Sequence, residues 1–75
     1  MAEEKMDLSG VPCPANAARA LMRLEGMDRG ATLAITIDDG EPAENLPPAL
    51  EQEGHLVLGR VRAGAKWIIT ARKGQ

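Results

Sequence analysis

The sequence contains a single cysteine, Cys13, and its setting favours thiol chemistry. Cys13 lies between Pro12 and Pro14, where a loop precedes the expected start of a helix. Unpaired backbone N–H groups and the positive end of the helix dipole stabilise a thiolate at such a position. We therefore expect the pKa of the thiol to lie below its usual value of about 8.5. A thiolate is the species that attacks sulfur and carries it as a persulfide.

The same cysteine has a plainer interpretation. A lone cysteine is often a small buried hydrophobic residue, and no histidine, acid or base adjoins Cys13 in the sequence. The one histidine, His55, follows Gly54 and is interpreted as structural or solvated, because a lone histidine needs a partner before it has a role. The residues around Cys13 therefore leave both interpretations open, a reactive thiol and an inert one.

Composition excludes several classes of site. One cysteine cannot form an internal disulfide, a CxxC redox pair or a cysteine zinc cluster, and one histidine makes a transition-metal site improbable. We expect neither a metal nor another cofactor. Trp67 is the one aromatic residue, so no platform for stacking bases is available and direct nucleic-acid binding is not expected.

The length of 75 residues predicts one small domain over residues 1–75. No run approaches the roughly 18 apolar residues of a membrane span. The first residues, Met-Ala-Glu-Glu-Lys, are acidic where a secretion signal is basic and then apolar. We expect a cytoplasmic protein without a membrane segment.

Charge is divided unevenly along the chain. The net charge is -2, but all eleven acids lie at or before Glu53, and the five bases that follow Gly54 have no acid among them. Such a division can orient a partner or attract a polyanion. The alternative is that these charges are simply solvated on the open face of a hairpin.

The spacing of apolar residues predicts the elements that position Cys13. Period-two alternation indicates strands, and apolar residues at positions 17, 20, 21 and 24 indicate one buried stripe of a helix. The second helix has an uncertain start, because Pro47 and Pro48 are tolerated only near a first turn. The order is βαβαββ, an α+β fold with a mixed four-stranded sheet and two helices on one face, a two-layer sandwich. The expected strands cover 5–9, 32–37, 55–62 and 66–72, and the expected helices cover 14–24 and part of 42–53.

Residues 6–14 read Met-Asp-Leu-Ser-Gly-Val-Pro-Cys-Pro. This segment resembles the signature of the TusA/SirA/YedF family of small sulfur-carrier (sulfurtransferase) proteins. The family has an apolar-Asp start, a glycine three residues before the cysteine, and then Cys-Pro-x-Pro. Similar residues follow in the family's order at 30–33, 38–39, 46–47, 54–55 and 72–74, so the resemblance covers nearly the whole chain.

The resemblance implies a sulfur relay rather than a stand-alone enzyme. Cys13 would accept sulfane sulfur from a cysteine desulfurase or a rhodanese-like donor and pass it to an acceptor protein. Members of the family serve tRNA thiolation, cofactor chemistry or sulfur metabolism, and related members act in selenium metabolism. Pro14 would hold the sulfur at the helix N-terminus, and a carrier that docks two partners in turn is expected to be a monomer.

One residue departs from the family pattern. Asn16 replaces the second proline of Cys-Pro-x-Pro, which frees the first turn and adds a polar group that can hydrogen-bond locally. This departure keeps open a second hypothesis, an interaction or regulatory module in which Cys13 is structural. Arg19 and Arg23 follow on the wet side of the same helix and could dock an acidic partner, although exposed arginines are also ordinary solubility features.

Overall fold

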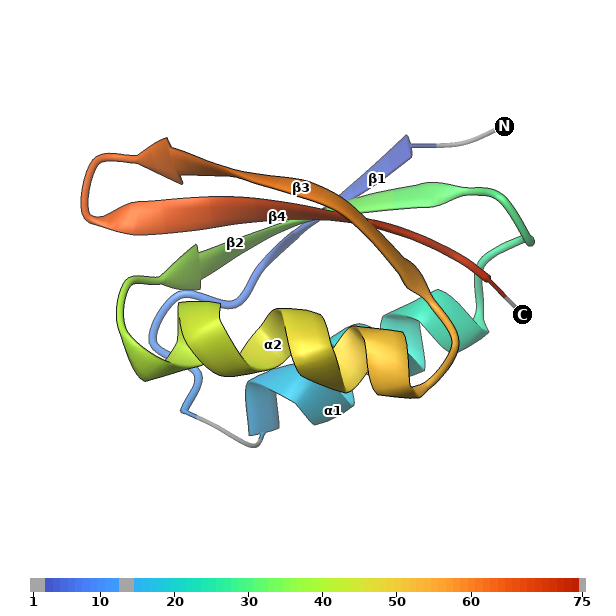
Figure 1. Ribbon diagram of the computed structural model, residues 1–75, viewed down its shortest axis with the longest axis horizontal. Coiled ribbons are helices and arrows are strands. Elements are labelled where there is room, and N and C mark those ends of the chain that lie inside the picture. Colours follow the sequence, from blue (N-terminus) through green and yellow to red (C-terminus); the bar gives the residue numbers. More distant parts are fainter. Residues whose placement is uncertain (1–2, 13–14, 75) are drawn as a thin grey trace.

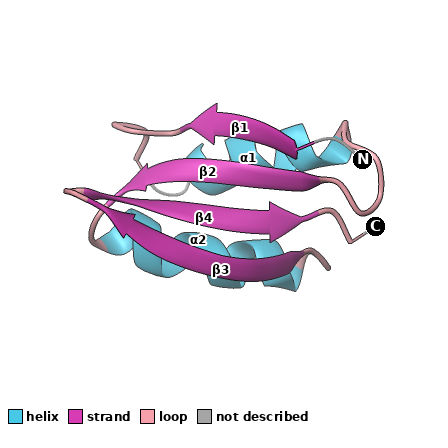
Figure 2. Cartoon of the chain, turned by 90° about the horizontal axis from the view of Figure 1, so that it is seen from above, coloured by secondary structure: helices cyan, strands magenta, loops and turns pink. Residues whose placement is uncertain are grey.

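The strand β2 (Thr32–Asp38) sets the arrangement of the layers. In the computed structural model, which describes residues 3–12 and 15–74, its side chains alternate strictly between buried and half-buried. Leu33, Ile35 and Ile37 are fully buried and face the helices. Neither helix of the described residues lies on the opposite face of this strand, so these helices cover the sheet on one side only (Figures 1 and 2).

The elements follow the predicted βαβαββ order. The sheet has the strand order β1-β2-β4-β3, in which β1 runs parallel to β2 and β4 runs antiparallel to both of its neighbours. Both helices lie beneath one face of the sheet (Figure 2). The predicted α+β two-layer sandwich is therefore confirmed. The remaining elements are β1 (Glu3–Asp7), α1 (Ala15–Glu25), α2 (Glu41–Gln52), β3 (Leu56–Ala63) and β4 (Lys66–Arg72).

Both helices begin at the same end of the molecule. The loop after β1, the turn after β2 and the β3–β4 hairpin all lie at this end, on the left of Figure 1. The turn after β2 needs Gly40, whose φ of 98° is a left-handed conformation that side-chain-bearing residues rarely adopt. No helix of the described residues is long and apolar enough to cross a membrane.

The buried stripe of α1 differs from the predicted one in its first turn. Ala20 and Leu24 are fully buried as expected, but Ala17 and Leu21 are only half-buried. Asn16 completes the stripe instead, because it lies four residues before Ala20 on the same side of the helix. An amide therefore occupies a position where periodicity favours an apolar side chain.

The helix α2 continues past the two prolines that made its start uncertain. Pro47 and Pro48 lie inside Glu41–Gln52, so the expectation that they sit near a first turn is wrong. Each proline removes one N–H donor from the helix, at a cost of about 3 kcal/mol in an ordinary helix interior. Leu46 and Leu50 flank the pair and are completely buried. Burial of each leucine contributes about 2 kcal/mol, which offsets part of that cost.

His55 has a structural role at the start of β3. It is 8% exposed, and its Nδ1 accepts a hydrogen bond from the Gly74 N–H (3.2 Å). Burial, with a smaller contribution from the charge of Lys73, lowers the pKa of His55 below its ordinary value of 6.5, while Glu53 acts in the opposite direction. The neutral form is therefore the one that the fold stabilises.

We predict that acid weakens the fold through His55. Because its pKa is lower in the folded than in the unfolded chain, its stabilisation is complete above pH 6.5 and is lost as the pH falls from there toward the folded-state pKa. Urea unfolding from about pH 8 to about pH 5 measures this slope. His55→Asn keeps an acceptor near the Nδ1 position without titrating in this range, so its slope should be flatter. Equal slopes in both proteins would contradict the assignment.

Candidate functional site

Cys13 and Pro14, the two central residues of the predicted site, lie outside the described residues. Their predicted roles therefore stay predictions. The described residues on both sides of them, up to Pro12 and from Ala15 onward, define the frame that holds this segment.

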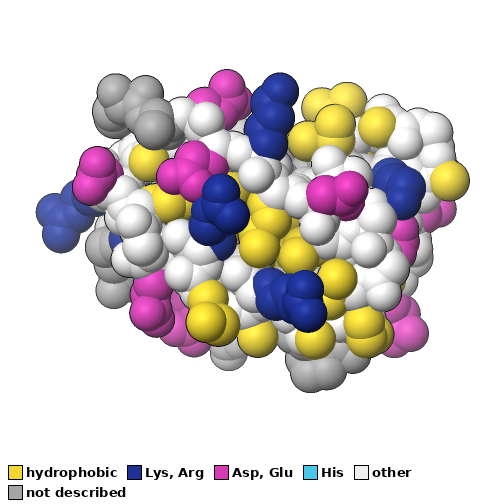
Figure 3. Space-filling view, turned by 180° about the vertical axis from the view of Figure 1, so that it is seen from behind, with side chains coloured by type: hydrophobic (Ala, Val, Ile, Leu, Met, Phe, Trp, Pro, Cys, Tyr) yellow, Lys and Arg dark blue, Asp and Glu magenta, His cyan; other side chains and the backbone are white. Residues whose placement is uncertain are grey.

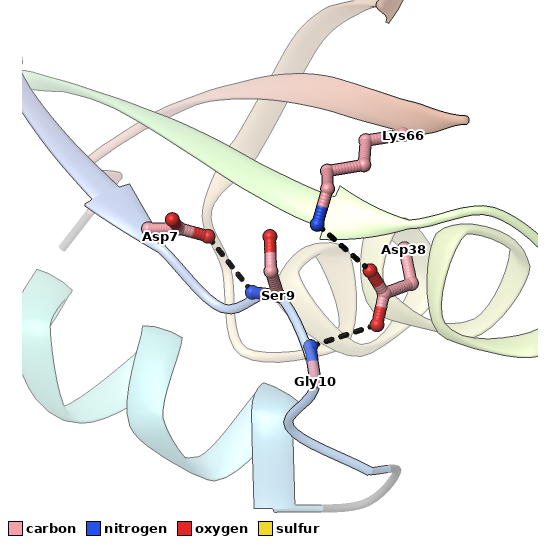
Figure 4. A network of polar contacts seen from close by, with 5 residues as sticks. All are labelled: Asp7, Ser9, Gly10, Asp38 and Lys66. Atoms are coloured by element: carbon pink, nitrogen blue, oxygen red, sulfur yellow. Dashed lines mark hydrogen bonds and ion pairs between the residues drawn. The ribbon is translucent and has the colours of Figure 1, made fainter. Parts of the chain in front are cut away.

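The loop before Cys13 is fastened to β2 by two hydrogen bonds. The Leu8 N–H donates to the Thr36 carbonyl oxygen (2.8 Å), and the Leu8 side chain is 1% exposed. The Gly10 N–H donates to Asp38 Oδ2 (2.8 Å; Figure 4). Gly10 has a φ of 78°, which suits glycine and turns the chain toward the start of α1. Two hydrogen bonds and the buried Leu8 side chain thus fix the loop that leads to Cys13.

Asp38 also connects the loop to the hairpin. Its Oδ1 lies 3.4 Å from Lys66 Nζ at the start of β4, so one carboxylate contacts both the Gly10 amide and a lysine (Figure 4). Nearby, Asp7 Oδ1 accepts the Ser9 N–H (2.9 Å). The Ser9 hydroxyl, and then the Ser9 backbone N–H, lower the pKa of Asp7 below its usual range. Asp7 and Asp38 therefore each hold a backbone N–H of the loop that leads to Cys13.

The neighbouring acid of the turn binds the hairpin as well. Asp39 Oδ1 accepts the Trp67 Nε1–H (2.7 Å), and its Oδ2 lies 3.2 Å from Arg62. The hydrogen bond from Trp67 is the main cause that lowers the pKa of Asp39. From the sequence, residues 38–39 are identified only as a segment that matches the family's order, and neither acid is predicted to bind the hairpin. The available signal was that two acids end a strand whose parallel neighbour leads directly to the cysteine.

At the start of α1, the Asn16 N–H donates to the Pro12 carbonyl oxygen (3.0 Å), so the backbone bonds across the cysteine segment. The Asn16 side chain is 1% exposed, and its Oδ1 accepts the Ala17 N–H (2.6 Å). This confirms the expected local hydrogen bond. Its Nδ2 is buried and has no partner among the described residues. A buried unpaired donor costs about 1–3 kcal/mol, so the burial of Asn16 lowers the folding stability of the chain by an amount of this order.

Arg19 and Arg23 both lie on the exposed side of α1, as predicted. Arg23 Nε bonds Glu4 Oε1 of β1 (2.7 Å), whereas Arg19 makes no ion pair with the described residues. Figure 3 shows this side of the molecule, where Lys and Arg side chains stand beside hydrophobic ones. Arg23 therefore helps to hold α1 against β1, whereas the Arg19 side chain stays available to contact a partner.

A cavity of about 290 Å³ lies away from this frame, toward the C-terminal end of α1. Lys73 is 9% exposed there, and its Nζ donates to the Leu24 carbonyl oxygen (2.8 Å). A cation at the end of a helix satisfies a free carbonyl and stabilises the helix dipole. His55 belongs to this cavity and not to the loop before Cys13. The lining residues are Leu21, Glu25, Glu53, His55 and Lys73.

We predict that Asp38→Ala loosens the loop before Cys13. The variant loses the acceptor for the Gly10 N–H and the partner of Lys66, and a hydrogen bond to a charged group contributes about 1.5–3 kcal/mol. Amide hydrogen exchange at Gly10 should therefore accelerate about tenfold or more. Asp28→Ala removes an exposed acid from another turn and serves as the control. Unchanged exchange at Gly10 in Asp38→Ala would contradict the anchoring role.

Comparison with known proteins gives one consistent family. The family model described as "Sulfurtransferase TusA" matches residues 4–73. A protein of Archaeoglobus fulgidus named "Putative sulfur carrier protein" is 36% identical over 73 residues, which cover 96% of this chain and 83% of that protein. The crystal structure of a SirA-like protein from Desulfitobacterium hafniense superimposes with a TM-score of 0.79 at 22% identity, covering 96% of this chain and 99% of that one. At this identity the structural likeness supports the fold alone.

Proposed function

The chain belongs to the sulfurtransferase TusA family, and we propose that it carries sulfane sulfur as a persulfide on Cys13. The observation that supports this proposal best is the anchoring on both sides of Cys13. The loop before it is bonded to β2 through Leu8 and Gly10, and the helix after it starts with the Asn16–Pro12 bond. A thiol that two partners must reach in turn benefits from such a fixed frame.

The transfer needs no further reactant. The Cys13 thiolate attacks the sulfane sulfur of a donor cysteine persulfide, which forms an S–S bond on Cys13 and breaks the S–S bond of the donor. The donor cysteine leaves as a thiolate, so the pair of proteins undergoes no net oxidation. An acceptor thiolate takes the sulfur from Cys13 by the same step. The partner supplies the activated sulfur, and this chain supplies a poised nucleophile.

Pro14 and the arginines of α1 have supporting roles in this proposal. As the residue directly after the nucleophile, Pro14 restricts the backbone there. Proline is also well suited to the start of a helix, where its missing N–H costs nothing. Arg19 is exposed and unpaired within the described part, so it suits an acidic patch on a cysteine desulfurase or rhodanese-like donor. Arg23 adds to the same basic side while it bonds Glu4.

We predict that Cys13 takes up one sulfur. Incubation with a cysteine desulfurase, cysteine and pyridoxal phosphate should raise the intact mass by about one sulfur atom, and dithiothreitol should remove the gain. Cys13→Ser should fold normally and gain nothing, and Pro14→Ala should load less with little loss of stability. Sulfur uptake by Cys13→Ser would show that the nucleophile is misassigned.

Polysulfide in place of the desulfurase separates a wrong donor from an inert thiol. Loading by polysulfide alone would point to a different donor protein. If polysulfide fails and iodoacetamide does not alkylate Cys13 at neutral pH, the thiol is structural and the interaction-module hypothesis holds instead.

We predict that Arg19→Glu slows loading by the desulfurase and leaves loading by polysulfide unchanged. A rim charge acts mainly on the association rate, so the effect should be about three- to tenfold at low salt and smaller at high salt. Arg29→Glu makes the same charge change in the exposed turn between α1 and β2 and is the matched control. An equal loss in both variants would rule out a specific docking role for Arg19.

A further inference from the structure

The strand β3 forms an open edge of the sheet. It pairs with β4 on one side, and no strand of the described residues pairs with its other side (Figure 2). Seven of its eight residues are exposed. Three of them are large aliphatic residues: Leu56 is 52% exposed, Leu58 is 50% exposed and Val61 is 66% exposed. Together with Arg60 and Arg62, these residues define what we call the β3 edge surface.

An edge of this kind is usually protected against pairing. Proteins use short edge strands, charges and bulges for that purpose, and β3 has a bulge between Val57 and Gly59 as well as its two arginines. The aliphatic side chains are nevertheless left in solvent over the full length of the strand. Gly59 adds open space, since a Cβ placed there would meet no atom within 4 Å. The surface therefore offers backbone groups, aliphatic contacts and room for an approaching chain.

The charge of this surface is one-sided. Residues 54–74 contain five bases and no acid. Arg62 and Lys66 are paired with Asp39 and Asp38 of the β2 turn, whereas Arg60 and Arg72 make no ion pair with the described residues. Both β3 arginines also lie over the Trp67 ring, at 5.5 Å for Arg60 and 5.2 Å for Arg62. This contact holds the two cations in place before any partner arrives.

We propose that the β3 edge surface binds an extended segment of a partner protein in which aliphatic and acidic residues alternate. The segment would add a fifth strand to the sheet, with its aliphatic side chains against Leu58 and Val61 and its carboxylates against Arg60. The inference goes beyond the proposed function and does not depend on Cys13, because every residue that it uses lies in the described range 56–72.

Two other occupants fit the surface less well. A second copy paired antiparallel about Val61 would set Arg60 of each copy opposite Arg62 of the other, and β3 itself contains no acid. Like charges directly opposite each other on adjoining strands are destabilising. RNA would use the arginines but would leave three exposed aliphatic side chains against a phosphate backbone. A peptide segment that carries both acids and aliphatic residues satisfies all the features at once.

A synthetic peptide that alternates valine and glutamate over the length of β3 tests the proposal against the full-length chain. Its binding should shift the backbone amide signals of residues 56–63 in NMR spectra and change the fluorescence of Trp67, which lies under both arginines. The affinity should fall about tenfold between about 50 mM and about 300 mM salt. The same peptide with lysine in place of glutamate should not bind.

Variants locate the site. Arg60→Glu should weaken the peptide about tenfold or more, and Val61→Thr, which keeps a β-branched residue on the strand, should weaken it severalfold. Arg29→Glu, the matched charge change, should bind as the natural chain does. No binding at millimolar peptide, shifts on α1 instead of β3, or equal binding by Arg60→Glu would each overturn the proposal. So would a β3-paired dimer in sedimentation, or stronger shifts of the same amides with a short RNA.

Discussion

The burial of one face of β2 determines where the other elements lie. Its side chains Leu33, Ile35 and Ile37 are completely buried on one side of the sheet, while β1 and β4 pair with its two edges. A chain of 75 residues has apolar material for one thin core, so both helices must lie against this face and the opposite face must stay open. The parallel pairing of β1 with β2 then brings the carboxyl ends of both strands to the same end of the sheet. The loop before Cys13 and the turn that carries Asp38 and Asp39 meet there as a consequence.

This arrangement separates the two regions for which we propose roles. At one edge, backbone bonds and Asp38 hold the loop before Cys13 and the start of α1, which suits the persulfide-carrying role that we propose for Cys13. At the other edge, β3 keeps its backbone and aliphatic side chains exposed. Asp38 connects the regions, because its carboxylate bonds the Gly10 N–H of the loop and contacts Lys66 of the hairpin. Asp39 adds two contacts to the hairpin, with Trp67 and Arg62. Two partners could therefore be held on separate surfaces.

Local patterns predicted most of the fold, since period-two alternation in 32–37 and the 3.6-residue period of α1 depend on neighbours in the chain. Features set by distant contacts were missed. Pro47 and Pro48 remain helical because flanking leucines are buried against the sheet, and Asn16 is buried because it extends the core-facing stripe of α1. The bond from Gly10 to Asp38 joins residues that lie 28 positions apart. The family signature pointed to Cys13, while its structural frame required the sheet topology.

The strand order has a consequence for how the protein is made. β4 is synthesised after every other element, yet it lies between β2 and β3 and pairs with β2 along its whole length. A nascent chain that has emerged only as far as residue 63 therefore lacks the strand that joins β2 to β3. Until β4 emerges, β3 has no neighbour in the sheet and β2 pairs with β1 alone. Cooperative folding must wait until residues 66–72 have left the ribosome. Residues 1–63 contain eleven acids and six bases, and this net negative charge opposes association with other copies in the meantime.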